Sequence, residues 1–241
     1  MSLNSSTAAQ AAVSSDTIEQ DTATLERLMA ARHSCRGFLP DLVPRETIER
    51  ILRIAQRTAS WCNTQPWHLT IASGAGAKRY SEALLAWASE HAPNPDFVWP
   101  EYAGESLARR RECGFALYDS VGIVKGDREA SKQQGLENFR LFGAPHVALI
   151  TTDAPLGVYG AVDIGGYVST FLTAIQSLGL GAIAQAALAS HADFTRQYFG
   201  FPEGRKLVCG ISFGYENTAH PANGFRTTRV DTSEAVNWVD A

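Results

Sequence analysis

Apolar residues recur at helical spacing in several parts of the chain. Leu25, Leu28 and Met29 share one face of a first helix expected over 24–33. Ile48 and Ile51 belong to a second helix, expected over 44–58, with proline as its first residue. Further helices are expected at 77–90, 105–124, 128–142 and 161–178. The helix over 161–178 has so few polar residues that we expect it to be buried on nearly all sides.

Other segments alternate apolar and polar residues as strands do. Leu207, Cys209, Ile211 and Phe213 alternate in this way. Strands are expected at 67–72, 144–152, 182–187 and 207–213. The interleaving of helices with a few strands, without an internal repeat or a linker, predicts one α+β or α/β domain.

Three segments fall outside this pattern. The stretch 91–104 holds three prolines together with Phe97, Trp99 and Tyr102, so we expect a loop that forms a lid or a pocket wall. Residues 1–23 are polar and predict a flexible N-terminal arm, which leaves a single domain over 24–241. The last part of that domain, about 217–241, is expected to be an extended C-terminal arm.

Composition narrows the class of protein. Of 241 residues 19% are charged, below the roughly 25% of an average soluble protein, which indicates a buried interface in an oligomer. The net charge of −4 argues against a nucleic-acid partner. No apolar run approaches about 18 residues, so no membrane span is expected. Four scattered cysteines and the lack of a signal peptide predict reduced thiols in the cytoplasm.

Several familiar motifs do not fit. Residues 179–184 match G-x-G-x-x-A, but a helix precedes them and a strand follows, which is the reverse of a dinucleotide-binding loop. No two histidines stand at metal-ligand spacing, so no metal is expected. Cys35 lies beside Arg36, which could lower the pKa of the thiol and so make it a nucleophile. No general base can be assigned from the sequence, so we interpret Cys35 as a packing residue.

Three segments carry polar groups suited to a phosphate and a flat heterocycle. Arg32-His33-Ser34-Cys35-Arg36 is expected to end the first helix, where the arginines could simply complement the helix dipole. Asn63-Thr64-Gln65-Pro66 opens a strand, and Pro66 favours an extended Gln65. Arg226 and Arg229 stand in the tail. Guanidinium, hydroxyl and amide groups together are the donors and acceptors that such a ligand needs.

The three segments also resemble a known family. R-H-S-C-R-G-F, S-W-C-N-T-Q-P-W-H and the closing L-V-C-G-I-S-F-G-Y-E, P-A-N and R-T-T-R resemble the FMN-dependent nitroreductase family over about 24–229. The resemblance implies an α+β, three-layer fold with a central mixed, mainly antiparallel sheet flanked by helices. It also implies an intertwined homodimer that exchanges C-terminal arms and holds FMN at its interface.

The resemblance assigns roles to individual residues. Arg32 and Ser34 would contact the phosphate and ribityl chain or the pyrimidine edge, and Arg36 would place a positive charge near flavin N1. His33, between them, is also implied as a cofactor residue. The remaining cofactor residues implied in this way are Asn63, Gln65, Gln185, Ala186, Ala187, Arg226 and Arg229. A backbone N–H of Ala186 or Ala187 would meet flavin N5. No side chain is expected to act as a catalytic residue, because the flavin carries the chemistry.

The implied activity is a two-step transfer at one site. NADH or NADPH would reduce the flavin, and a nitroaromatic compound or a quinone would then take the electrons, with Phe97, Trp99 and Tyr102 as the wall on the acceptor side. Two alternatives stay open. The protein could be a flavoenzyme of the same fold that performs dehalogenation or flavin fragmentation, or a flavin-binding module without turnover.

Overall fold

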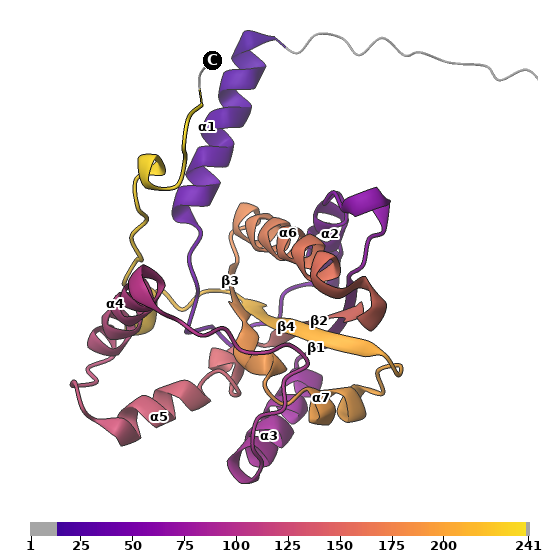
Figure 1. The fold of residues 1–241 in the computed structure, drawn as a ribbon, viewed down its shortest axis with the longest axis vertical. Coiled ribbons are helices and arrows are strands. Elements are labelled where there is room, and N and C mark those ends of the chain that lie inside the picture. The colour runs from indigo at the N-terminus through magenta and orange to yellow at the C-terminus, as the bar shows by residue number, and fades with distance from the viewer. Residues whose placement is uncertain (1–13, 240–241) are drawn as a thin grey trace, which may run out of the picture.

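The structure, a computed structural model, describes residues 14–239 (Figure 1). One sheet has the strand order β1-β2-β4-β3. Its strands are β1 His68–Ser73, β2 His146–Asp153, β3 Gly181–Gln185 and β4 Arg205–Gly214. All three neighbouring pairs are antiparallel, and an isolated parallel bridge joins Ser34 to Ala182 of β3. The expected mainly antiparallel sheet is confirmed, and its parallel part is limited to this bridge.

Helices cover both faces of this sheet. They are α1 Ser15–Ala31, α2 Arg45–Ala55, α3 Ala75–Glu90, α4 Gly104–Ser120, α5 Arg128–Leu136, α6 Gly157–Ser177 and α7 Ala192–Phe199. α2 and α6 pack on one face, and α3 and α7 pack on the other (Figure 1). The layers are therefore helix, sheet and helix, as the α+β expectation requires.

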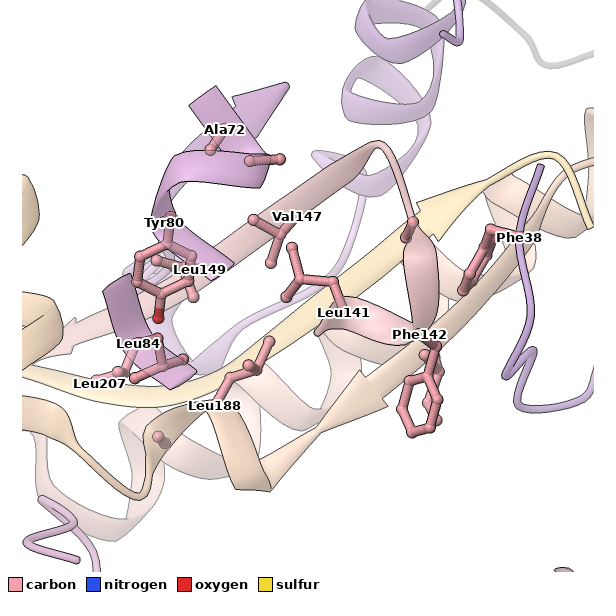
Figure 2. Close-up of a cluster of buried hydrophobic side chains, with 14 of the residues drawn as sticks. Phe38, Ala72, Tyr80, Leu84, Leu141, Phe142, Val147, Leu149, Leu188 and Leu207 are labelled. Atoms are coloured by element: carbon pink, nitrogen blue, oxygen red, sulfur yellow. The ribbon is translucent and has the colours of Figure 1, made fainter. Parts of the chain in front are cut away.

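Strand β2 connects the two cores. Val147 and Leu149 join Tyr80 of α3 in one apolar cluster (Figure 2), whereas Ala148 and Ile150 join the cluster on the α6 side. Because successive side chains of a strand point to opposite faces, a strand between two helix layers buries both sets of side chains. This explains why Val147, Ala148, Leu149 and Ile150 follow one another as an apolar run rather than a strict alternation.

The first helix differs from its expected bounds. It begins at Ser15 rather than at residue 24, and the Ser14 hydroxyl accepts a hydrogen bond from the Thr17 N–H as a helix N-cap. The expectation of a flexible arm over 1–23 is therefore wrong for 15–23, while 1–13 lie outside the described residues. None of the side chains of α1 is buried, and Leu25 is 56% exposed.

Helix α6 also differs from the expectation. Ile164 and Phe171 are fully buried, but Val158 and Val162 are 68% and 63% exposed, so this chain alone does not surround the helix. Among the described residues, the span Ala154–Ser177 is long and apolar enough to cross a membrane by length and composition, with a hydropathy of 1.2. Its contacts are those of a core helix, since α6 packs on α2 and on the sheet.

Most other elements agree with the expected bounds within four residues. Two differences remain. The helix expected over 128–142 ends at Leu136, because Leu141 and Phe142 have φ values of 56° and 52°, which a right-handed helix does not allow. Helix α7 was not expected at all. The stretch 179–184 does follow a helix and enter a strand, which confirms the expected order of the elements there.

Candidate functional site

The segment after α1 is extended rather than helical. α1 ends at Ala31, which corrects the expectation that the arginine-rich segment closes the helix. Ser34 forms its bridge with Ala182, and the Cys35 N–H donates to the Ala182 carbonyl at 3.0 Å. Side chains of an extended chain alternate, so Arg32, Ser34 and Arg36 share one side and Cys35 faces the other. The R-x-S-x-R spacing thus presents two guanidinium groups and a hydroxyl together.

Cys35 is a packing residue. It is fully buried, and its thiol donates to the Gly37 carbonyl at 3.3 Å. Burial raises the pKa of the Cys35 thiol to about 11, so the thiol stays protonated at neutral pH. This supports the interpretation of Cys35 as core rather than nucleophile.

The C-terminal arm approaches this segment from the other side. One guanidinium nitrogen of Arg226 donates to the Asn223 and Phe225 carbonyls at 2.7 and 2.8 Å. Arg229 donates to the Thr227 hydroxyl at 2.9 Å. The Phe225 ring lies 5.5 Å from the guanidinium carbon of Arg36.

A pocket of about 320 Å³, here called the arginine pocket, lies between the two segments. Six of the predicted cofactor residues line it: Arg32, His33, Ser34, Arg36, Arg226 and Arg229. A neighbouring cavity of about 510 Å³, here called the α4 pocket, shares Arg226 and Arg229 and is closed by Arg109, Glu112 and Cys113 of α4. Residues nearly 200 positions apart in the chain therefore meet around one cavity.

The arginine pocket carries unbalanced positive charge. Within 14–239, none of its four arginines forms an ion pair with a carboxylate. Burial lowers the pKa of the Arg36 guanidinium, because desolvation disfavours the charged form, although arginine remains a cation in water at neutral pH. Four guanidinium groups without a counter-ion, in a chain of net charge −4, are suited to a phosphate.

His33 is held by its neighbours. Its Nε2 lies 2.9 Å from a carboxylate oxygen of Glu216, and its Nδ1 lies 3.1 Å from the Ala31 carbonyl. The side chain lines the arginine pocket, yet both ring nitrogens already have partners in the chain. His33 therefore joins the segment after α1 to the segment after β4.

Asn63 and Gln65 do not reach the arginine pocket. They lie in an exposed loop, where the side-chain oxygen of Gln65 accepts from the side-chain nitrogen of Gln56 at 2.9 Å. The φ of Gln65 is 48°, so the extended backbone expected before Pro66 is wrong, and Cys62 and Asn63 also have positive φ. Three non-glycine residues in this region of φ mark a strained loop, which is typical of functional sites.

The Gln185 side chain belongs to the core. It is buried, its amide nitrogen donates to the Asn138 carbonyl at 3.0 Å, and its oxygen accepts from Ser212 at 2.5 Å. The hydrogen bonds of this side chain are therefore made within the chain, and its cofactor role stays a prediction. Ala186 and Ala187 begin a short 3₁₀ turn, whose first N–H groups have no partner within the turn. Ala186 is exposed, so the role of a backbone donor there stays a prediction.

The aromatic loop is anchored at one end only. Both carboxylate oxygens of Asp96 accept from Arg196 at 2.7 Å, and one also accepts from the Leu207 N–H. The predicted acceptor-side residues follow this anchor. Phe97 lies under Lys206, Tyr102 lies under Arg110, and Trp99 is 43% exposed. None of these three aromatic residues lines the arginine pocket or the α4 pocket, so their role stays a prediction.

Sequence reasoning missed two contributions to the site. Arg109, Glu112 and Cys113 stand at i, i+3 and i+4 on α4, and that spacing could have indicated a shared helix face. Asn223 was quoted within P-A-N without a role, although it is 4% exposed and contacts Arg36. Among the described residues, no group of His, Cys, Asp or Glu could hold a metal ion.

Comparisons with known proteins identify the family of this chain. The family model described as "Nitroreductase family" matches residues 29–215. Nitroreductase NfnB of Mycolicibacterium smegmatis is 36% identical over 88% of this chain and 92% of its own length. A 4-nitrobenzoate reductase of Nocardioides sp. is 30% identical over 89% of this chain and 90% of its own length.

Solved structures give the same result. The crystal structure of FMN-dependent NfnB from Mycobacterium smegmatis in complex with NADPH has a TM-score of 0.87 at 35% identity, covering 91% of this chain and 99% of its own. An FMN- and NADPH-dependent NfnB from a Sphigopyxis strain has a TM-score of 0.86 at 27% identity, covering 90% of this chain and 99% of its own. With a family model that matches most of its length and a relative above one-third identity, this chain is a member of the nitroreductase family.

Proposed function

We propose that the protein is an FMN-dependent NAD(P)H oxidoreductase that reduces nitroaromatic compounds and quinones. The observation that carries the proposal is the arginine pocket, where four guanidinium groups without carboxylate partners meet the Ser34 hydroxyl. Relatives that match nearly the whole chain are named as reductases of nitrobenzoate, chloronitrobenzene and nitrobenzene.

The residues present fit FMN. Its phosphate requires cationic donors, which Arg32, Arg226 and Arg229 supply at one end of the pocket. Arg36, more deeply placed and without a counter-ion, would hold a fixed positive charge beside the flavin ring, near N1. The N–H groups that begin the 3₁₀ turn at Ala186 and Ala187 would donate toward N5.

When bound, FMN accepts a hydride from NADH or NADPH at N5 and passes the electrons to the acceptor. The protein's part is to bind, to orient and to supply charge. No side-chain acid stands at the 3₁₀ turn, where Ala186, Ala187, Leu188 and Ala189 follow one another. Protons for the nitro group would therefore come from water or from the cofactor.

A homodimer is part of the proposal. Asn63 and Gln65, which the family resemblance assigns to the cofactor, do not line the arginine pocket of their own chain. Both α1 and α6 carry exposed apolar residues, among them Leu25, Val158 and Val162. A second copy that covers these faces would bring its Asn63–Gln65 loop to the pocket, and the C-terminal arms would exchange between the subunits.

The remaining parts of the proposal are location and partners. All four cysteines are free thiols, and Cys62 is exposed, which suits the reducing cytoplasm. The net charge of −4 gives no support for a nucleic-acid partner. α6, the apolar helix, is accounted for by its packing on the sheet, so we propose no membrane partner.

The visible absorption spectrum of the purified protein is the first test. We expect a flavin spectrum that bleaches with NADPH or NADH under nitrogen and returns when a nitroarene is added. A colourless protein that stays colourless with added FMN would overturn the proposal. A flavin that binds but does not bleach with either nucleotide would indicate a flavin-binding module instead.

A further inference from the structure

Asn223 is a buried polar residue at the base of the C-terminal arm. It ends a short 3₁₀ turn, Pro221–Asn223, and is 4% exposed. Its side-chain nitrogen donates to the carbonyls of Gly37 and Asn217, both at 2.9 Å. Its side-chain oxygen accepts from the Arg36 N–H at 2.6 Å. Three of the four hydrogen-bonding positions of this amide are therefore used within the chain.

These bonds join two parts of the arginine pocket that are distant in sequence. The side chain of Asn223 holds the backbone at Arg36 and Gly37, from which the Arg36 guanidinium extends. The backbone carbonyl of the same residue accepts from the Arg226 guanidinium at 2.7 Å. One residue thus contacts both the arginine assigned to the flavin ring and an arginine assigned to the phosphate.

The close approach of the two segments depends on a small residue beside this bond. A Cβ atom on Gly37 would lie 2.3 Å from Cγ of His220, three residues before Asn223. The Asn217 N–H also donates to the Gly37 carbonyl, at 3.0 Å. Residues 217–223, at the start of the C-terminal arm, therefore have a defined position against the segment after α1. The side chain of Asn223 bonds to both of these segments.

We propose that Asn223 is a positioning residue that fixes Arg36 and Arg226 relative to each other, and so sets both the affinity for FMN and the reduction potential of the bound flavin. The inference rests on the proposed function. Asn223 acts through the two arginines and needs no contact with the ligand itself. The side chain has to be an amide, because its oxygen accepts from the Arg36 N–H while its nitrogen donates to two carbonyls.

The test uses Asn223→Asp and Asn223→Ala in the full-length protein. Aspartate keeps the size and the acceptor for the Arg36 N–H, but it would face the Gly37 and Asn217 carbonyls with oxygen instead of a donor. Alanine removes all three bonds. The readouts are the FMN dissociation constant of the apoprotein, measured by flavin fluorescence, and the reduction potential of the bound flavin, measured against a reference dye.

Thr195→Val serves as the matched control. It removes another buried side-chain hydrogen bond, to Tyr80 at 3.0 Å, in the core on the α3 and α7 side of the sheet. A second control is Asn223→Ala in an Arg36→Ala background. If Asn223 acts through Arg36, its effect on the potential disappears in that background, whereas its effect on the affinity through Arg226 stays.

We expect the dissociation constant of both Asn223 variants to rise by about tenfold, within the range for lost hydrogen bonds between neutral groups, because the partners of the side chain are backbone groups. The potential should become more negative, and Thr195→Val should leave both quantities unchanged. Asn223 variants that lose thermal stability but keep the wild-type affinity and potential would overturn the proposal. So would an unchanged shift of potential in the Arg36→Ala background. A wild-type protein that does not bind FMN would instead overturn the proposed function.

Discussion

His146 accepts a hydrogen bond from the Val43 N–H at its Nε2 atom, over 2.9 Å, in the buried region between β2 and the segment before α2. Because Nε2 accepts this bond, it carries no proton, and the ring is neutral with its proton on Nδ1. Nδ1 lies 2.9 Å from the Ser73 hydroxyl. Protonation of Nε2 would break the bond to Val43 and would place a charge in the core. Burial accordingly lowers the pKa of His146.

The first prediction concerns acid stability. Because the folded-state pKa of His146 lies below the ordinary value of about 6.5, the unfolded state binds the extra proton first as pH falls. The free energy of unfolding should therefore decrease from about pH 6.5 downward. Urea unfolding of the wild type and of His146→Gln at several pH values measures this. If the free energy of unfolding of the variant depends on pH as that of the wild type does, another group causes the acid sensitivity. His191 is then the next candidate, since burial lowers its pKa too.

A second prediction concerns the core on the α3 side. Tyr80→Phe leaves the Thr195 hydroxyl buried without its partner, and we expect a loss of about 1–3 kcal/mol in the free energy of unfolding. Adding Thr195→Val should recover part of that loss, because the unpaired hydroxyl is then removed as well. Flavin content should stay normal in both variants. A double variant that is less stable than the sum of the singles would contradict this account.

A third prediction separates two arginines of the pocket. Arg36→Ala should lower the flavin potential and slow flavin reduction while FMN stays partly bound, because a fixed charge beside the ring is lost. A tenfold weaker preference for reduced over oxidised flavin corresponds to about 30 mV. Arg229→Ala should mainly weaken FMN retention. Arg79→Ala, an exposed arginine on α3, is the control. Normal flavin content and turnover in both pocket variants would reject these assignments.

A fourth prediction concerns steady-state kinetics. If donor and acceptor use the same flavin face in turn, double-reciprocal plots at several acceptor concentrations should be parallel. The measurement varies NADPH against a nitroarene under nitrogen. Intersecting lines would mean that both substrates bind together, and the single shared site would be wrong.

A fifth prediction concerns assembly. Val162→Glu places a charge on the exposed apolar face of α6, so the variant should sediment as a smaller species than the wild type. Its flavin content should fall as well, since the Asn63–Gln65 loop would come from the second copy. Arg79→Glu on α3 changes charge without touching this face and should behave as the wild type. If the wild type and both variants sediment alike, the α6 face is not part of the interface.

Much of the layered core could be predicted from the sequence, because burial leaves a periodic signal. β2 reads as a strand since Val147 and Leu149 face one helix layer and Ala148 and Ile150 face the other. α1 was placed too late, because its start depends on the Ser14 cap and its apolar residues have no core partner in this chain. The α6 helix was expected to be buried all round for a related reason. The sequence shows that a helix face is apolar, but it does not show whether the same chain or a second molecule covers that face.

The site was predictable where residue type alone determines chemistry. The arginines and Ser34 were predicted from residue type and from the family resemblance, and the structure brings them to one pocket. The partners of the Gln185 side chain could not be predicted, since an amide suits a ligand and a core network equally, and only the fold places Asn138 and Ser212 beside it. The backbone of Gln65 was predicted wrongly, because its positive φ depends on bonds to Ser60 and Gln56 that no local preference contains.

The extended segment after α1 also limits how this chain can vary. Arg32, Ser34 and Arg36 face the pocket because they are two residues apart, and Cys35 fills the core between them. Inserting or deleting one residue here would turn the arginines toward the apolar cluster and the thiol toward the pocket. A substitution at one of these positions changes one side chain, whereas a change in length would reverse which side chains face the pocket and which face the core. The spacing of the motif is therefore under a stricter constraint than any single side chain within it.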